Sequence, residues 1–235
     1  MECAFLVYSP ITGALVAKKR LYEGALGIKT AALSPNGMYL AVGLYDQSLR
    51  LFSPISWRQV LSCAHSQPFP QSTPLLYREA EYRDPESRQV STHYLVEETL
   101  TLTPLQVPPD TPNPPIGISL CVWSFDSHYL ATRNDSTPNL IYIWDLQTLS
   151  LHSILIHQDP VKAVVWAPNR NVLALSSAQD RVFVWTETGA SVCDVPLETG
   201  EFRVGSLQWD SRGESLLLMD KATLMVAFTQ FEAGE

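Results

Sequence analysis

The sequence predicts an all-β protein made of repeated four-stranded sheets, and three observations support this prediction. A 12-residue stretch, Leu120 to Ala131, recurs around Leu33, Trp166 and Trp209 in the 235-residue chain. In each copy a large apolar residue precedes a leucine by seven positions, and Trp123, Trp166 and Trp209 follow one another at intervals of 43 residues. A constant spacing in this range is typical of repeated structural units, and no segment shows a long apolar stripe of helical period.

The first elements belong to an incomplete and then to a complete unit. Residues 5–8 and 14–17 are apolar segments on either side of a Thr12-Gly13 turn, so we expect two strands of a unit whose beginning is missing. Residues 28–61 then predict four strands joined by tight turns. In the first of these turns, Ser34 to Gly37, proline presets one backbone angle and Asn-Gly accepts a positive φ.

Residues 62–116 interrupt the repeat and are predicted to be a Pro-rich insertion. They hold 10 of the 17 prolines, and proline cannot donate to a sheet ladder, so most of the insertion should be loop. Residues 75–77 and 93–97 could still be strands. A degenerate repeat is the competing interpretation of this region.

The regular units resume after the insertion. Residues 117–156 and 161–197 predict the second and third complete units, and residues 204–228 predict three strands of a further partial unit. We expect residues 1–235 to form a single repeat domain, or a fragment of one, that carries the insertion at 62–116.

Composition and motifs argue against several classes of function. A net charge of −8 disfavours nucleic-acid binding, and the longest apolar runs are too short for a membrane span. The four cysteines form no CxxC pair and the five histidines show no metal-ligand spacing, so no metal is expected. Without a Gly-rich phosphate loop or a nucleophile motif, we expect no cofactor, no catalytic residue and no small-molecule substrate. The N-terminus lacks the features of a signal peptide, and a reducing, cytoplasmic compartment is expected.

The residues at the end of each third strand are similar to those of a known repeat family. An aromatic residue lies there in every unit, namely Tyr8, Phe52, Trp144, Trp185 and Phe228, and Trp144-Asp145 is a literal WD dipeptide. Together these features resemble the WD-repeat β-propeller. The resemblance implies a partial propeller with three complete four-stranded blades and two partial blades, each blade covering the apolar face of the next.

Longer segments resemble a narrower group. Two segments resemble the C-terminal half of a family of centrosomal WD-repeat proteins. One consists of residues 127–139 followed by 143–145, and the other of residues 27–30 running through 41–46. The similarity also covers the insertion and residues 167–169. It implies a non-enzymatic adaptor of the cytoplasm and cytoskeleton, at centrosomes and spindle poles. Such adaptors act with a coiled-coil protein in microtubule anchoring, spindle assembly and cilium assembly.

Two alternatives remain beside the centrosomal adaptor. One is a propeller that reads modified peptides, as a chromatin or ubiquitin-ligase adaptor, which would need an aromatic cage or an arginine cluster on one face. The other is an enzyme that uses a propeller funnel, which would need convergent carboxylates or histidines.

Candidate site residues lie in the loops, where repeat proteins commonly bind their partners. The loop of residues 133–139 is longer than its counterparts and polar, and the expected partner contacts are Tyr45, Arg133, Asn134 and Gln179. WD repeats use an aspartate before the third strand to organise the turn through hydrogen bonds, and the residues that match this position are Asp46, Asp135 and Asp180.

Overall fold

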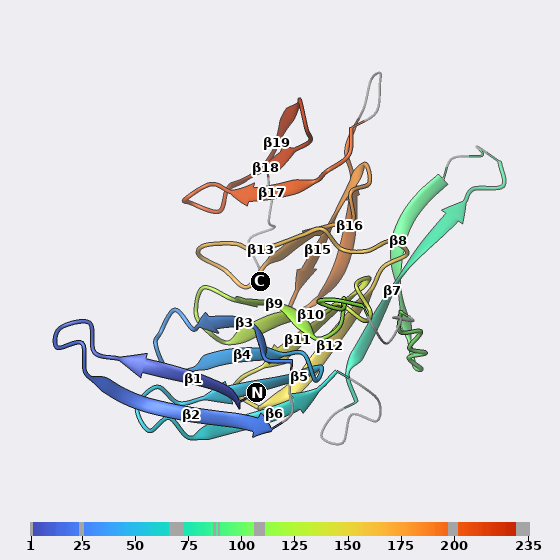
Figure 1. Ribbon diagram of the computed structural model, residues 1–235. Coiled ribbons are helices and arrows are strands. Elements are labelled where there is room, and N and C mark those ends of the chain that lie inside the picture. Colours follow the sequence, from blue (N-terminus) through green and yellow to red (C-terminus); the bar gives the residue numbers. More distant parts are fainter. Residues whose placement is uncertain are drawn as a thin grey trace. The chain divides into compact units, whose positions relative to one another are not determined.

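The computed structural model describes residues 2–23, 26–65, 73–86, 88, 90–105, 111–196 and 202–228. Every regular element in these residues is a β-strand, and the strands form five sheets (Figure 1). Three sheets contain a complete set of four consecutive strands, and the other two contain two and three strands. The predicted all-β fold, with three complete and two partial blades, is confirmed.

The chain divides into two compact units, which are described separately here. Unit 1 consists of Met1–Pro70, Leu102–Cys121 and Thr132–Thr137, and unit 2 consists of Gln71–Thr101, Val122–Ala131 and Pro138–Glu235. Strands β9 (Ile118–Trp123) and β10 (Tyr129–Asn134) contribute residues to both units. The interpretation of residues 1–235 as a single domain stays a prediction.

Unit 1 contains the first partial sheet and the first complete one. Antiparallel strands β1 (Glu2–Tyr8) and β2 (Leu15–Glu23) form the partial sheet. The complete sheet has the order β3 (Ile28–Leu33), β4 (Leu40–Leu44), β5 (Ser48–Phe52) and β6 (Gln59–Ala64). Both sheets supply residues to one apolar cluster, in which the rings of Phe5 and Phe52 meet edge to face at 5.1 Å.

Two strands from the Pro-rich insertion extend the second complete sheet. Its order is β8-β7-β12-β11-β10-β9, where β7 is Leu75–Arg83, β8 Val90–Glu97, β11 Leu140–Asp145 and β12 Ser150–Ile156. β7 pairs with β12 in parallel, from Leu75 opposite Ser153 to Arg78 opposite Ile156. Both segments of the insertion that could have been strands, 75–77 and 93–97, are therefore strands of one antiparallel hairpin.

The remaining sheets of unit 2 follow the repeat closely. The third complete sheet has the order β13 (Ala163–Trp166), β14 (Leu173–Ser176), β15 (Arg181–Thr186) and β16 (Gly189–Asp194). The last sheet has the order β17 (Ser206–Trp209), β18 (Ser215–Met219) and β19 (Leu224–Phe228). All neighbouring strands in these two sheets are antiparallel.

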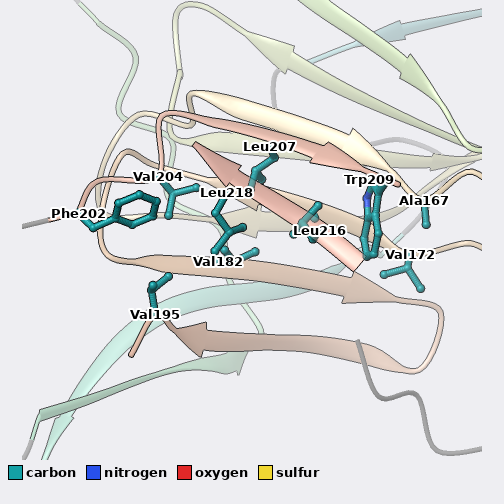
Figure 2. Close-up of a cluster of buried hydrophobic side chains, with 11 residues drawn as sticks. Ala167, Val172, Val182, Val195, Phe202, Val204, Leu207, Trp209, Leu216 and Leu218 are labelled. Carbon is teal, nitrogen blue, oxygen red and sulfur yellow. The ribbon is translucent and has the colours of Figure 1, made fainter. Parts of the chain in front are cut away.

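A buried apolar cluster, called the apolar seam below, joins these two sheets (Figure 2). Its members are Ala167, Val172, Ala174, Val182, Val195, Phe202, Val204, Leu207, Trp209, Leu216 and Leu218. A single sheet cannot cover both of its own faces, so residues that alternate along β17 and β18 are buried only because they pack against the preceding sheet.

The landmark tryptophans point toward the preceding sheet and make a repeated hydrogen bond. The indole Nε1 of Trp209 donates to the carbonyl oxygen of Val165 at 3.4 Å, and that of Trp166 donates to the carbonyl oxygen of Val122 at 3.0 Å. Trp166 also stacks on Tyr129, with ring centroids 6.2 Å apart. The constant sequence spacing of the tryptophans therefore corresponds to a constant spatial relation between consecutive sheets of unit 2.

Candidate functional site

The loop after β10 places Asp135 at the centre of a charged cluster in unit 1. Its Oδ2 lies 2.7 Å from Lys29 Nζ, and its Oδ1 accepts from the Ser119 hydroxyl and lies 3.4 Å from Arg133 Nη2. Burial alone would raise the pKa of Asp135, but the hydrogen bonds from Lys29 and Ser119 and the two nearby cations hold it below its usual range. Asp135 is therefore a charged anchor for two basic side chains.

Tyr45 covers the same cluster. The Lys29 ammonium lies 4.9 Å from the centroid of the Tyr45 ring and donates to the carbonyl oxygen of Ile116 at 2.7 Å. The Tyr45 hydroxyl bonds to the side chain of Asn113. Gly117 permits this arrangement: it has φ +87°, and an added Cβ would lie 2.6 Å from Tyr45 Cα. A side chain at position 117 would push the two backbones apart.

Asn134 is placed differently from its neighbour. It is 1% exposed; its amide nitrogen donates to Gln47 Oε1 at 3.0 Å, and its Oδ1 accepts from the backbone N–H of Ser136 at 3.1 Å. This buried amide closes the turn from within. The sequence predicted Asn134 as a partner contact, and a buried side chain does not suit that role.

A buried histidine supports the same part of unit 1. His65 Nε2 lies 2.7 Å from Thr132 Oγ1, and the His65 side chain is buried. Burial lowers the pKa of His65 to about 3, although a backbone hydrogen bond to Gln47 offsets part of the shift. The imidazole is therefore neutral at physiological pH and acts as a fixed polar contact.

The other two candidate turn aspartates make local contacts of different kinds. Asp46 Oδ1 accepts from the backbone N–H of Ser48 at 2.9 Å, and its Oδ2 lies 3.3 Å from Arg50 Nη2. The Asp180 carboxylate is half-exposed and bonds the guanidinium of the adjacent Arg181, at 3.3 Å from Nη2. The contacts of Asp46 are those of a turn organiser, whereas those of Asp180 are with a side chain.

A second set of turn side chains lies between the first and second strands of the sheets, and of these turns only Ser34 to Gly37 was predicted. Asn36 accepts from the N–H of Met38, Asp126 from the N–H of His128, and Asp210 from the N–H of Ser215, all at 2.9 Å. Short polar side chains just after a strand are the signal that could have identified them. Hydrogen bonds of this kind also hold the pKa values of Asp126 and Asp210 below their usual range.

Gln179 belongs to unit 2, whereas Tyr45, Arg133 and Asn134 belong to unit 1. The Gln179 amide nitrogen donates to Asp159 Oδ2 at 2.6 Å, and its backbone carbonyl accepts from the N–H of Val204 at 2.9 Å. Its side chain is half-buried and lies at the turn that precedes β15. The four candidate contacts are thus divided between the units, and only Tyr45 and Arg133 converge on the same lysine–aspartate pair.

Unit 2 also contains a buried charged cluster that sequence analysis did not identify. The carboxylate of Glu79, in the insertion hairpin, lies 3.7 Å from Nδ1 of His157 after β12 and 4.0 Å from Nη1 of Arg181 in β15. The Glu79 and His157 side chains are fully buried. The position of Glu79 in the strand Leu75–Arg83 does not predict that its carboxylate is buried beside charged groups, because its partners lie far away in the sequence.

Among the described residues, no group of three or more His, Cys, Asp or Glu side chains is placed to hold a metal ion. The same residues include no helix of the length and hydropathy that a membrane crossing requires.

Comparison with known proteins identifies similar repeats. The family described as WD domain, G-beta repeat matches residues 18–53 and 148–186. The WD repeat-containing protein WRAP73 of Mus musculus is 32% identical over 247 residues, covering 98% of this chain and 53% of that protein. An uncharacterized WD repeat-containing protein of Schizosaccharomyces pombe is 27% identical over 164 residues, covering 69% of this chain and 32% of that protein.

The chain spans about half the length, or less, of these curated relatives. Among solved structures, U3-55K is similar with a TM-score of 0.47 and 15% identity, covering 89% of this chain and 53% of that chain.

Proposed function

We propose that this chain, which matches the WD-repeat family over residues 18–53 and 148–186, is a non-enzymatic scaffold that binds other proteins through its loops. The similarity to WRAP73, at 32% identity over 98% of the chain, is the observation that carries the proposal. Repeated sheets that bury their apolar faces against one another form a rigid support, and variable loops on such a support are suited to partner binding.

The more specific part of the proposal concerns place and partner. We propose a centrosomal and spindle-pole adaptor that binds a coiled-coil protein and contributes to microtubule anchoring, spindle assembly and cilium assembly. The resemblance of residues 27–46 and 127–145 to centrosomal WD-repeat proteins supports this choice. The acidic chain, with a net charge of −8, favours a partner segment that presents lysine and arginine side chains.

For the contact residues, we propose Tyr45 and Arg133 of unit 1 and Gln179 of unit 2. Each has a half-buried side chain that already makes a polar contact, so each is held in a defined orientation. Asn134 is left out because its side chain is buried. We propose that Asp46 and Asp135 hold the neighbouring loops in place.

The proposal is tested by affinity capture of the full chain from cell lysate, followed by direct binding of the purified partner. We expect recovery of a coiled-coil centrosomal protein and a Kd at least about tenfold weaker, equivalent to 1.4 kcal/mol, for the Tyr45→Ala and Arg133→Ala double variant. Arg58→Ala and Gln147→Ala are the matched controls, because both side chains are exposed and lie in turns between the third and fourth strands of their sheets, whereas Tyr45 and Arg133 lie beside turns between the second and third.

Three results would count against the proposal, and they differ in meaning. Capture of histone peptides or ubiquitin-ligase subunits would favour the modified-peptide reader instead. Turnover of a substrate by the purified protein would show that it is an enzyme. Equal loss of binding in the Arg58→Ala control would show that the effect is one of general charge and not of the proposed loop surface.

A further inference from the structure

The hairpin β7–β8 connects two consecutive sheets of unit 2. On one side, β7 pairs with β12 over only four residues, Leu75–Arg78. On the other side, β8 lies against β15 and β16 of the next sheet, and the Tyr94 ring packs on Phe183 with centroids 5.7 Å apart. The hairpin therefore contacts two consecutive sheets of unit 2, and its backbone pairing with the first of them is short.

The Glu79 carboxylate lies where this ladder ends. The paired register stops at Arg78 opposite Ile156, and Glu79 Oε2 then accepts from the backbone N–H of Gln158 at 2.9 Å. The same oxygen lies 3.7 Å from His157 Nδ1, while Oε1 lies 4.0 Å from Arg181 Nη1. One fully buried carboxylate on β7 thus faces groups from the β12 end and from β15.

The β8 side of the hairpin completes the cluster. Arg181 Nη1 also donates to Thr92 Oγ1, and the Tyr94 hydroxyl lies 3.3 Å from His157 Nε2. The His157 ring packs on Phe183, with centroids 4.4 Å apart. The Glu79 carboxylate faces Nδ1 at 3.7 Å and favours the neutral tautomer that carries its proton there, so Nε2 is left to accept from the Tyr94 hydroxyl.

These contacts have an energetic consequence. A buried carboxylate costs several kcal/mol of desolvation unless its charge is matched, and here the matching groups come from two elements outside the hairpin. We propose that the hairpin β7–β8 is a detachable strap, which ties two consecutive sheets of unit 2 together through the Glu79–His157–Arg181 cluster and is released by mild acidification before those sheets unfold. Release would expose the outer edge of β12, which the strap covers.

The direction of the pH effect follows from His157. Burial lowers the pKa of His157, and the Glu79 carboxylate offsets only part of this shift. The docked ring therefore binds a proton less readily than the ring of a detached strap, whose pKa returns to about 6.5. Docking is consequently strongest above that pH and weakens as the pH falls through it.

Glu79 weakens docking at low pH as His157 does, and Arg181 contacts two further carboxylates. Burial alone would raise the pKa of Glu79, but His157, the Gln158 N–H and Arg181 outweigh it and keep the pKa below its usual value. Protonation of Glu79 in the detached strap therefore adds a second loss of docking at more acidic pH. The Arg181 guanidinium also lies 3.3 Å from the Asp180 carboxylate and 4.0 Å from that of Asp194.

The strap is tested by hydrogen–deuterium exchange of the full chain at a series of pH values, corrected for the intrinsic exchange rate. Between pH 6.5 and 5.5, we expect the protection of residues 75–97 to fall by up to about tenfold, as expected for linkage to one proton. Protection of β13, β14 and β18 should stay unchanged. Glu79→Gln should lower the protection of residues 75–97 at neutral pH, and His157→Gln should remove its pH dependence in this range.

Glu81→Gln is the matched control, because Glu81 lies on the same strand with an exposed side chain. A parallel loss of protection throughout unit 2, or an unchanged protection of residues 75–97 across the pH series, would overturn the proposal. The wild-type series requires no substitution, so it decides the question even if Glu79→Gln does not fold. Failure of the strap would leave the scaffold proposal untouched, because partner binding is measured separately.

Discussion

Unit 2 contains two junctions between β elements that are closed by opposite chemistry. In the apolar seam, Val, Leu, Phe and Trp side chains fill the space, and Trp209 makes a hydrogen bond through its indole N–H. In the strap junction, a carboxylate, an imidazole and a guanidinium meet in a buried site. An apolar junction is specified by volume and has no titratable group, whereas a charged junction is specified by the identity of each partner. The apolar seam is therefore suited to a permanent contact, and the strap junction to a contact that depends on pH.

The apolar seam should respond most strongly to lost volume. Trp209→Ala removes the largest side chain of the cluster together with its hydrogen bond to Val165. We expect a loss of about 3–5 kcal/mol in the free energy of unfolding, since truncation of a buried tryptophan leaves a cavity that the surrounding strands fill only in part. Urea unfolding, followed by circular dichroism, measures this change.

Trp209→Phe is the control for this prediction, because it keeps an aromatic ring in the seam. It should cost less than half as much as Trp209→Ala. A loss below about 1 kcal/mol for Trp209→Ala would mean that the seam collapses around the missing ring, and that volume does not specify this junction.

The strap junction should respond to lost pairing. Arg181→Met keeps most of the side-chain length but leaves Glu79 without its nearest permanent cation. We expect a loss of about 1–3 kcal/mol, because an unsatisfied buried charge carries its desolvation cost while the Gln158 N–H still supports it. Urea unfolding gives the stability, and hydrogen exchange of residues 75–97 locates the damage.

A second substitution separates pairing from packing. If charge matching is the cause, adding Glu79→Leu to Arg181→Met should recover part of the loss, because a buried ion pair can be replaced by apolar side chains at little cost. The two changes should then be non-additive by about 0.5–3 kcal/mol, the range for residues in one network. Strict additivity would show that Glu79 and Arg181 act independently.

The sequence predicted the apolar junctions well and the polar ones poorly, for a physical reason. The seam depends on residue type at a regular spacing, so the intervals between Trp123, Trp166 and Trp209 revealed it. The strap depends on Glu79, His157 and Arg181, whose separations in the sequence carry no signal. Residues 75–77 and 93–97 were expected as possible strands, but the parallel pairing of β7 with β12 was not predicted, because register across a long loop is fixed by tertiary contacts.

The same limit explains why the buried position of Asn134 in one turn of unit 1 was not predicted. Asn134 and Asp135 are both short, polar and suited to turns, so local sequence cannot decide which side chain points inward. Gln47 receives the amide of Asn134, and Lys29 attracts the carboxylate of Asp135. Lys29 lies in β3 and Gln47 in the turn between β4 and β5, and only the folded arrangement brings them to the loop after β10.

The smallest expected effect distinguishes ring packing from hydrogen bonding within the strap junction. Tyr94→Phe keeps the ring contact with Phe183 but removes the hydroxyl that donates to His157 Nε2 at 3.3 Å. We expect a loss of about 0.5–1.5 kcal/mol, as for one neutral hydrogen bond. Without that donor the docked imidazole accepts a proton more easily, so the docked and detached pKa values approach each other and the pH dependence of residues 75–97 becomes shallower. A steeper dependence in Tyr94→Phe would mean that the hydroxyl does not favour the neutral ring, and that the difference between the two junctions does not arise from the protonation of His157.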